Sequence, residues 1–175
     1  RYEEVADAIR TMVVRGAPAI GAAGAYGLAL SAVSYTGSDV SSLKRRMHKA
    51  KELLFKTRPT AHDLSDGLVF VSACLNESTV PMIRQRAVDL AEEYARLSIA
   101  RCQKIGEFGA ELIRDGDSIL THCNAGALAT VDIGTALAPV RAAHAQGKTV
   151  FVFVEETRAR LQGARLTAWE LPQEV

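Results

Sequence analysis

The spacing of apolar residues predicts that residues 1–114 are almost entirely helical. Val5, Ile9 and Met12 lie three or four positions apart, which is the period of an amphipathic helix. The period is interrupted before Pro18 and Pro59, because a proline disfavours helix at the residue that precedes it. The expected helices cover residues 2–14, 19–35, 42–57, 62–75 and, after an N-cap at Thr79, a long helix to residue 112.

The pattern changes at Asp115-Gly116-Asp117 to one that predicts alternating strands and helices. Short apolar runs at 118–122 and 149–154 are typical of buried strands. Helices are expected over 127–146, with Gly147 as the C-terminal cap, and from 162 to 171. The order of strand, helix and strand predicts a right-handed parallel unit.

The predicted fold class is therefore α/β, with a helical N-terminal domain over residues 1–114 and part of a Rossmann-like domain over 115–175. Two parallel strands alone make a sheet with open edges. We therefore expect a truncated domain, or one that another polypeptide chain completes.

Composition and charge narrow the classes of partner. The 175 residues carry 21 lysines and arginines against 20 acids, and this balance favours neither nucleic acid nor a membrane surface as a partner. Residues 17–33 form the most apolar run, but alanine and glycine dominate it, so it is too weakly hydrophobic to span a membrane. Its Gly21, Gly24 and Gly27 leave a bare stripe that another backbone can approach closely.

Three widely spaced cysteines argue against a disulfide framework and against a zinc site. Together with an N-terminus unlike a signal peptide, they predict a cytoplasmic protein. The four histidines show no metal-ligand spacing, and no metal is expected. Cys74 and Cys102 fall within helical patterns and are expected in the core, while His48 and His144 are expected at the surface.

Two arginines beside turns are candidates for binding a phosphate. Arg15 precedes Gly16 and Ala17, where a turn opens a helix, so guanidinium and free backbone N–H donors occur together. Arg58 precedes Pro59, which fixes the backbone and can hold the side chain toward a ligand. The alternative for each arginine is a solvent-facing side chain in a linker.

Cys123 is the candidate nucleophile. It lies where the first strand should end and a helix begin, and ligands of open α/β sheets bind at the carboxyl ends of strands. A helix N-terminus lowers the pKa of a thiol, although a buried structural cysteine is the alternative. Residues 121–127 do not match GxGxxG, so no dinucleotide cofactor is expected.

Gln162 follows the second strand and should lie at the same edge of the sheet as Cys123. With Gly163, it opens a helix and can donate to a phosphate or a sugar. A solvated charged loop is the alternative reading of this segment.

Four stretches in a fixed order resemble the methylthioribose-1-phosphate isomerase family of methionine salvage. They are RGAPAIGAAGAYGLAL (15–30), TRPTA (57–61), GDSILTHCNAGALATVDIGTAL (116–137) and ETRARLQGARLTAWEL (156–171). The superfamily also contains the eIF2B regulatory subunits and ribose-1,5-bisphosphate isomerase.

This resemblance implies isomerisation of 5-methylthioribose 1-phosphate to 5-methylthioribulose 1-phosphate by a homodimer without a cofactor. It implies that Cys123 is the catalytic cysteine, working with an aspartate that acts as general acid. By motif position, it assigns substrate binding to Arg15, Gly16, Ala17, Arg58 and Gln162.

The sequence also departs from the family pattern. The family's aspartate lies in a GADxxxxNG-like segment that this sequence lacks, and Ala159 and Asp63 stand where proline and asparagine are common. We expect an internal piece of the enzyme, inactive unless a C-terminal fragment completes the fold. The alternatives are ribose-1,5-bisphosphate isomerase and a non-catalytic eIF2B-like assembly subunit; the presence of Cys123 favours an enzyme.

Overall fold

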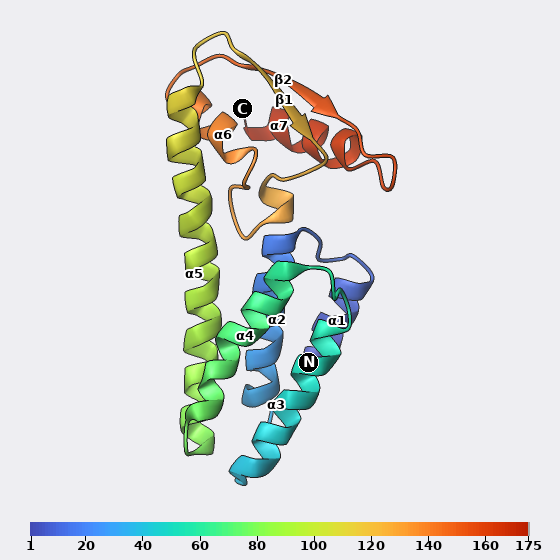
Figure 1. Cartoon of the computed structure of the whole chain (residues 1–175), viewed down its shortest axis with the longest axis vertical. Helices are drawn as coiled ribbons and strands as arrows, with labels where there is room; N and C mark the ends of the chain where they lie inside the picture. The colour runs from blue at the N-terminus through green and yellow to red at the C-terminus, as the bar shows by residue number, and fades with distance from the viewer. Residues whose placement is uncertain (175) are drawn as a thin grey trace. The chain divides into compact units, whose positions relative to one another are not determined.

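The computed structural model describes residues 1–174 and divides the chain into two compact units. Unit 1 comprises Arg1–Leu97 and unit 2 begins at Ser98. Helix α5 (Val80–Leu112) belongs in part to each unit (Figure 1). The helices together with a small parallel sheet confirm the predicted α/β class, while the domain boundary after residue 114 stays a prediction.

Unit 1 is a helical bundle whose elements follow the predicted order. Its elements before α5 are α1 (Tyr2–Arg10), α2 (Ala17–Val33), α3 (Val40–Phe55), α4 (His62–Ser72) and a 3₁₀ turn η1 (Ala73–Asn76). Helix α1 ends at Arg10, earlier than expected, because the chain turns at Met12 and Gly16, both with positive φ. The N–H of Met82 donates to Thr79 Oγ1 at 3.3 Å, which confirms Thr79 as the N-cap of α5.

Helices α2 and α4 pack in parallel through their glycines. A Cβ at Gly21 would lie 2.7 Å from the Asp63 carbonyl oxygen, and a Cβ at Gly67 would overlap the Gly21 carbonyl. Gly24 in turn faces Leu64. The close backbone approach predicted for the glycine stripe is therefore confirmed at Gly21, while Gly24 and Gly27 face side chains. The contact of Gly21 with Asp63 places the N-termini of the two helices side by side.

The same apolar stretch raises the question of a membrane span. Within residues 1–174, none of the helices has both the length and the hydrophobicity that crossing a bilayer requires.

Unit 2 contains two parallel strands in the predicted places. Strand β1 (Ser118–His122) pairs with β2 (Phe151–Glu155), in a register that sets Ser118 opposite Phe151 and His122 opposite Glu155. The remaining elements are a 3₁₀ turn η2 (Ala127–Ala129), α6 (Ala138–Ala145), a π-helical turn η3 (Gly163–Thr167) and α7 (Ala168–Glu174). The predicted helix over 162–171 is therefore present, although it begins with a wider π turn.

The two faces of this sheet differ in burial. Ile119, Val152 and Val154 face a small core formed by α6 and α7. Leu120 and Phe153, on the opposite face, are 66% and 53% exposed. Side chains alternate between faces along a strand, so the expectation of fully buried strands is wrong for one face.

The expected helix over 127–146 is also wrong in its first half. Residues 130–137 form a loop between η2 and α6, in which Gly134 has φ +94° and a Cβ there would lie 2.6 Å from Gly126 Cα. The Thr135 N–H donates to the Ala125 carbonyl at 2.9 Å. The chain thus folds back onto the segment after Cys123, and α6 starts only at Ala138. Gly147 has φ +81°, as its predicted role as a cap requires.

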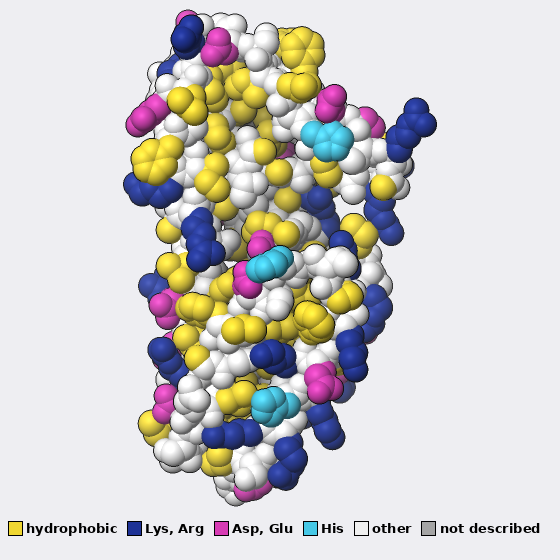
Figure 2. Space-filling view, viewed as in Figure 1, with side chains coloured by type: hydrophobic (Ala, Val, Ile, Leu, Met, Phe, Trp, Pro, Cys, Tyr) yellow, Lys and Arg dark blue, Asp and Glu magenta, His cyan; other side chains and the backbone are white. Residues whose placement is uncertain are grey.

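We predict that the exposed sheet face makes the chain self-associate. Figure 2 shows apolar side chains gathered over the part of the surface where Figure 1 draws β1 and β2. Phe153→Thr retains a strand-forming residue while removing apolar area, so it should lower the apparent mass in sedimentation velocity. Val69→Ser, at a 59% exposed position on α4, is the control and should leave association unchanged. A wild-type chain that stays monomeric at all concentrations would contradict the prediction.

Candidate functional site

Cys123 lies at the carboxyl edge of the sheet in a strained backbone conformation. It directly follows β1, and its φ of 64° lies in the left-handed region that non-glycine residues rarely adopt. Its N–H donates to the carbonyl of Glu155, the last residue of β2, at 3.2 Å, so pairing continues one residue past β1. The side chain is half-buried and the thiol is free. A strained residue at a ligand-binding edge is a candidate functional position.

The helix predicted to follow Cys123 begins at Ala127 as expected, but it is a single 3₁₀ turn that ends at Ala129, and residues 124–126 separate it from the thiol. Instead, the loop is fixed by buried polar groups from the C-terminal segment. Asn124 Nδ2 donates to Glu170 Oε1 at 2.9 Å, and Thr167 Oγ1 donates to the Cys123 carbonyl at 2.6 Å. The sequence analysis did not identify Asn124, Thr167 and Glu170 as functional residues. Only the contacts between segments far apart in the chain show that they hold this loop.

Gln162 lies at the same edge as Cys123. It immediately precedes Gly163, at which a Cβ would overlap the Glu155 carbonyl that accepts from Cys123. Gln162 Oε1 accepts a 3.0 Å hydrogen bond from the Thr157 hydroxyl. The Glu156 carboxylate accepts from the N–H groups of Gly163 (3.3 Å) and Ala164 (2.7 Å). The backbone N–H groups at this helix start are therefore bonded to Glu156 and are not free for a ligand. Of the predicted ligand donors here, only the Gln162 side chain is left.

A second group of predicted residues gathers at one end of unit 1. Gly16, with φ +91°, is the N-cap of α2, and Ala17 begins the helix. Arg15 precedes them, and Arg58 lies in the turn before α4; both arginines are half-buried. The two connections lie at the same end of the bundle (Figure 1), where α2 and α4 begin side by side. Two helix N-termini and two guanidinium groups are a combination that attracts a phosphate.

The six predicted site residues thus fall into two groups. Cys123 and Gln162 share one edge of unit 2, whereas the others share one end of unit 1. The substrate-binding and catalytic roles that the family resemblance implies for these residues stay predictions.

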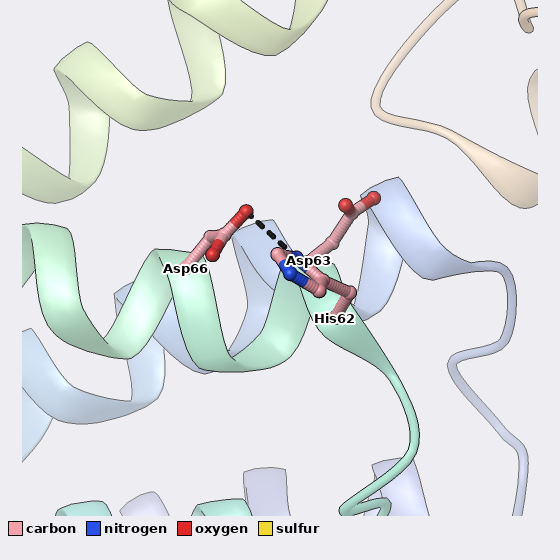
Figure 3. Close-up of side chains that lie close together, drawn as sticks. All are labelled: His62, Asp63 and Asp66. Atoms are coloured by element: carbon pink, nitrogen blue, oxygen red, sulfur yellow. Dashed lines mark hydrogen bonds and ion pairs between the residues drawn. The ribbon is translucent and has the colours of Figure 1, made fainter.

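The first turn of α4 carries a histidine and two aspartates (Figure 3). His62 Nδ1 lies 3.1 Å from Asp66 Oδ2, and ligand atoms of His62, Asp63 and Asp66 lie within 4.8 Å of one another. This i,i+4 spacing differs from the expectation that the histidines lack metal-ligand spacing. His62 and Asp66 are exposed and bond to each other, while Asp63 points away from the pair. We therefore describe a surface hydrogen bond and assign it no metal.

The remaining cysteines and histidines lie where the sequence predicted. Cys74 and Cys102 are buried, and His48 and His144 are exposed. Burial raises the pKa of the Cys74 thiol to about 11, and burial followed by the charge of Asp132 raises the pKa of Cys102. His122 Nδ1 lies 3.2 Å from Glu155 Oε2 on the neighbouring strand, which agrees with the expectation that it does not pair with Cys123.

Comparison with known proteins shows which family the chain resembles. The model of the Initiation factor 2 subunit family matches residues 13–175. A methylthioribose-1-phosphate isomerase of Thermosipho africanus is 50% identical over 175 residues, which cover 97% of this chain and 49% of that protein. The chain spans about half the length of the curated relatives it matches.

Two solved structures share the fold closely. The 5-methylthioribose 1-phosphate isomerase of Pyrococcus horikoshii has a TM-score of 0.92 at 40% identity, covering 99% of this chain and 49% of its own. A protein of Archaeoglobus fulgidus described as translation initiation factor eIF-2B, subunit delta, has a TM-score of 0.88 at 49% identity, covering 99% and 51%. These similar proteins therefore bear both an enzyme's name and a translation factor's name.

We predict that Cys123 reacts with an alkylating reagent before the two buried cysteines. Iodoacetamide attacks thiolates, and with a pKa of about 11 only about one Cys74 side chain in a thousand is ionised at pH 8. Half-buried Cys123 should therefore be alkylated first, and Cys74 should gain reactivity only as the pH rises toward 11. Peptide mass mapping at several pH values measures the order, and the chain unfolded in urea should lose it. Equal rates at Cys74 and Cys123 in the folded chain would be inconsistent with this structure.

Proposed function

The chain belongs to the initiation factor 2 subunit family, and from that membership we propose that the complete gene product isomerises 5-methylthioribose 1-phosphate to 5-methylthioribulose 1-phosphate. The observation that carries the proposal is Cys123, a half-buried free thiol held in a left-handed conformation at the carboxyl edge of a parallel sheet. The isomerase relatives at about half sequence identity support the choice of substrate.

The reaction requires no external oxidant. One ring carbon–oxygen bond opens, the hydrogen on C2 moves to C1, the C2 hydroxyl loses its proton, and the former ring oxygen gains one. C2 is oxidised while C1 is reduced within the same molecule. We place Cys123 beside these two carbons, where a fixed polarisable group and exclusion of water favour the transfer.

The substrate phosphate would bind at the unit 1 group. The N–H groups that open α2, at Gly16 and Ala17, offer neutral donors, and Arg15 and Arg58 offer charged ones. Gln162 would hold a sugar hydroxyl near Cys123. We further propose that the protein works as a cytoplasmic homodimer, with a helical domain over 1–114 and a Rossmann-like domain from 115.

A non-catalytic assembly subunit is the second candidate function. It is favoured by the 49% identity to the A. fulgidus protein described as an eIF-2B subunit. Such a subunit needs the fold but has no need of a thiol at position 123. Dependence on Cys123 therefore separates the two candidates.

We expect Cys123→Ala and Cys123→Ser each to lower turnover by at least about 100-fold in the complete gene product, since the group at the reacting carbons is lost. ¹³C NMR measures turnover directly, because the anomeric C1 becomes a CH₂ group and C2 becomes a ketone. Cys102→Ala, which removes a thiol buried away from the sheet edge, is the matched control and should remain active. Absence of turnover in the wild type would favour the assembly subunit, whereas full turnover in both Cys123 variants would refute the catalytic role of Cys123.

Arg58→Ala should mainly weaken substrate binding. Loss of one charged hydrogen bond costs about 1.5–3 kcal/mol, which corresponds to a rise in KM of roughly 10- to 150-fold with a smaller change in kcat. Arg96→Ala, at an exposed position on α5, is the control for loss of an arginine. The measurement is steady-state kinetics with 5-methylthioribose 1-phosphate and with ribose 1,5-bisphosphate. An unaltered KM in Arg58→Ala would remove this residue from the site.

A further inference from the structure

We propose that Glu170 is a positioning residue that holds the Cys123 loop in its reactive conformation, an inference that rests on the proposed function of Cys123. Glu170 lies on α7, far along the chain from the thiol, and is only 1% exposed. A carboxylate loses its hydration when it is buried to this extent, so it persists only where the fold supplies partners.

The partners of Glu170 lie on both sides of the loop that follows Cys123. Oε1 accepts a 2.9 Å hydrogen bond from Asn124 Nδ2, and Oε2 accepts a 3.2 Å bond from the Leu128 N–H. Asn124 is the residue next to Cys123, and Leu128 belongs to the turn that ends the loop. One carboxylate thus joins the two ends of residues 124–128.

Thr167 adds a third attachment three residues earlier in the same segment. Its hydroxyl donates to the Cys123 carbonyl at 2.6 Å and accepts from Asn124 Nδ2 at 3.1 Å. Residues three apart lie on the same helical face, so Thr167 and Glu170 contact the loop together. Their combined hydrogen bonds oppose relaxation of the positive φ at Cys123.

The charge of Glu170 has a compensating partner in Arg141 on α6. Arg141 Nη2 lies 3.8 Å from Glu170 Oε2, and its side chain is only 13% exposed. Arg141 Nη1 also donates to the Ile133 carbonyl, in the loop before α6. Burial lowers the pKa of Arg141, and the nearby charges of Glu170 and Asp132 oppose that shift. Through this ion pair, Glu170 is linked to residue 128 by its own hydrogen bond and to residue 133 by the hydrogen bond of Arg141.

The carboxylate also fits the loop sterically. A Cβ at Gly126 would lie 1.6 Å from Glu170 Oε1, so the carboxylate occupies the space that any larger side chain at position 126 would need. Gly126→Ala therefore displaces the carboxylate from the loop without removing its charge. This substitution perturbs the same contact from the opposite side.

Glu170→Gln changes the contact with almost no change in shape. The amide replaces one acceptor oxygen by an NH₂ donor, which must then face either the Leu128 N–H or Asn124 Nδ2, and it removes the charge opposite Arg141. Either orientation breaks one of the two bonds that hold residues 124–128, so hydrogen exchange on this chain should show amides of residues 124–128 exchanging at least about 10-fold faster. In the complete gene product we expect kcat to fall at least about 10-fold, with KM changing less than about 3-fold, at unchanged circular dichroism.

A merely structural role would lower the apparent kcat only in proportion to the unfolded fraction seen by circular dichroism, would leave KM unchanged, and would raise exchange throughout unit 2. Glu111→Gln, at an exposed position on α5, is the control for loss of a carboxylate. If Glu170→Gln does not fold, Gly126→Ala and Thr167→Val carry the same test. Folded variants with unchanged exchange across residues 124–128 and unchanged kcat would overturn the proposal.

Activity of Cys123→Ala separates this proposal from the one on which it rests. If Cys123→Ala is inactive while folded Glu170→Gln keeps its kcat, the positioning role is wrong and the proposed function stands. If Cys123→Ala is fully active, the proposed catalytic role of Cys123 fails, and the positioning role fails with it.

Discussion

The hydrogen bond from the Cys123 N–H to the Glu155 carbonyl is the interaction on which the geometry of unit 2 depends. It extends the parallel pairing of β1 and β2 by one residue. The segments that follow the two strands therefore begin next to each other at the same edge of the sheet. Cys123 then turns into a left-handed conformation, and the segment after Glu155 leads to Gln162. A shift of one residue in this register would reverse the faces of the strand side chains and separate the thiol from Gln162.

The sequence predicted those features that depend on local chemistry. The bounds of β1, the cap at Thr79 and the turn at Gly147 follow from residue preferences within a few positions, and all are present. The helix expected over 127–146 is not formed in its first half, where Gly134 packs against Gly126. The spacing of apolar residues along the chain does not predict such a contact. Likewise, Cys123 and Gln162 could be predicted because each follows a strand that the sequence pattern indicates. The role of Glu170 could not be predicted, because it depends on which distant loop α7 contacts.

The chemistry proposed for this protein is divided between the two units. Unit 1 offers positive charge and helix N-termini, which suit an anion, while unit 2 offers a thiol and an amide, which suit a sugar. The fold alone does not decide between the two names that similar structures bear, because one fold supports several functions. The decision rests on a few side chains at the ends of helices and strands.

The glycine contact between α2 and α4 limits how this arrangement can evolve. Gly21 and Gly67 meet where even a methyl group would strike the backbone of the facing helix. Any larger residue would force the two helices apart and widen the gap between the turns that carry Arg15 and Arg58. The separation of those two positive charges therefore depends on the absence of side chains at Gly21 and Gly67. Substitutions at these glycines should be tolerated as poorly as substitutions of the arginines themselves.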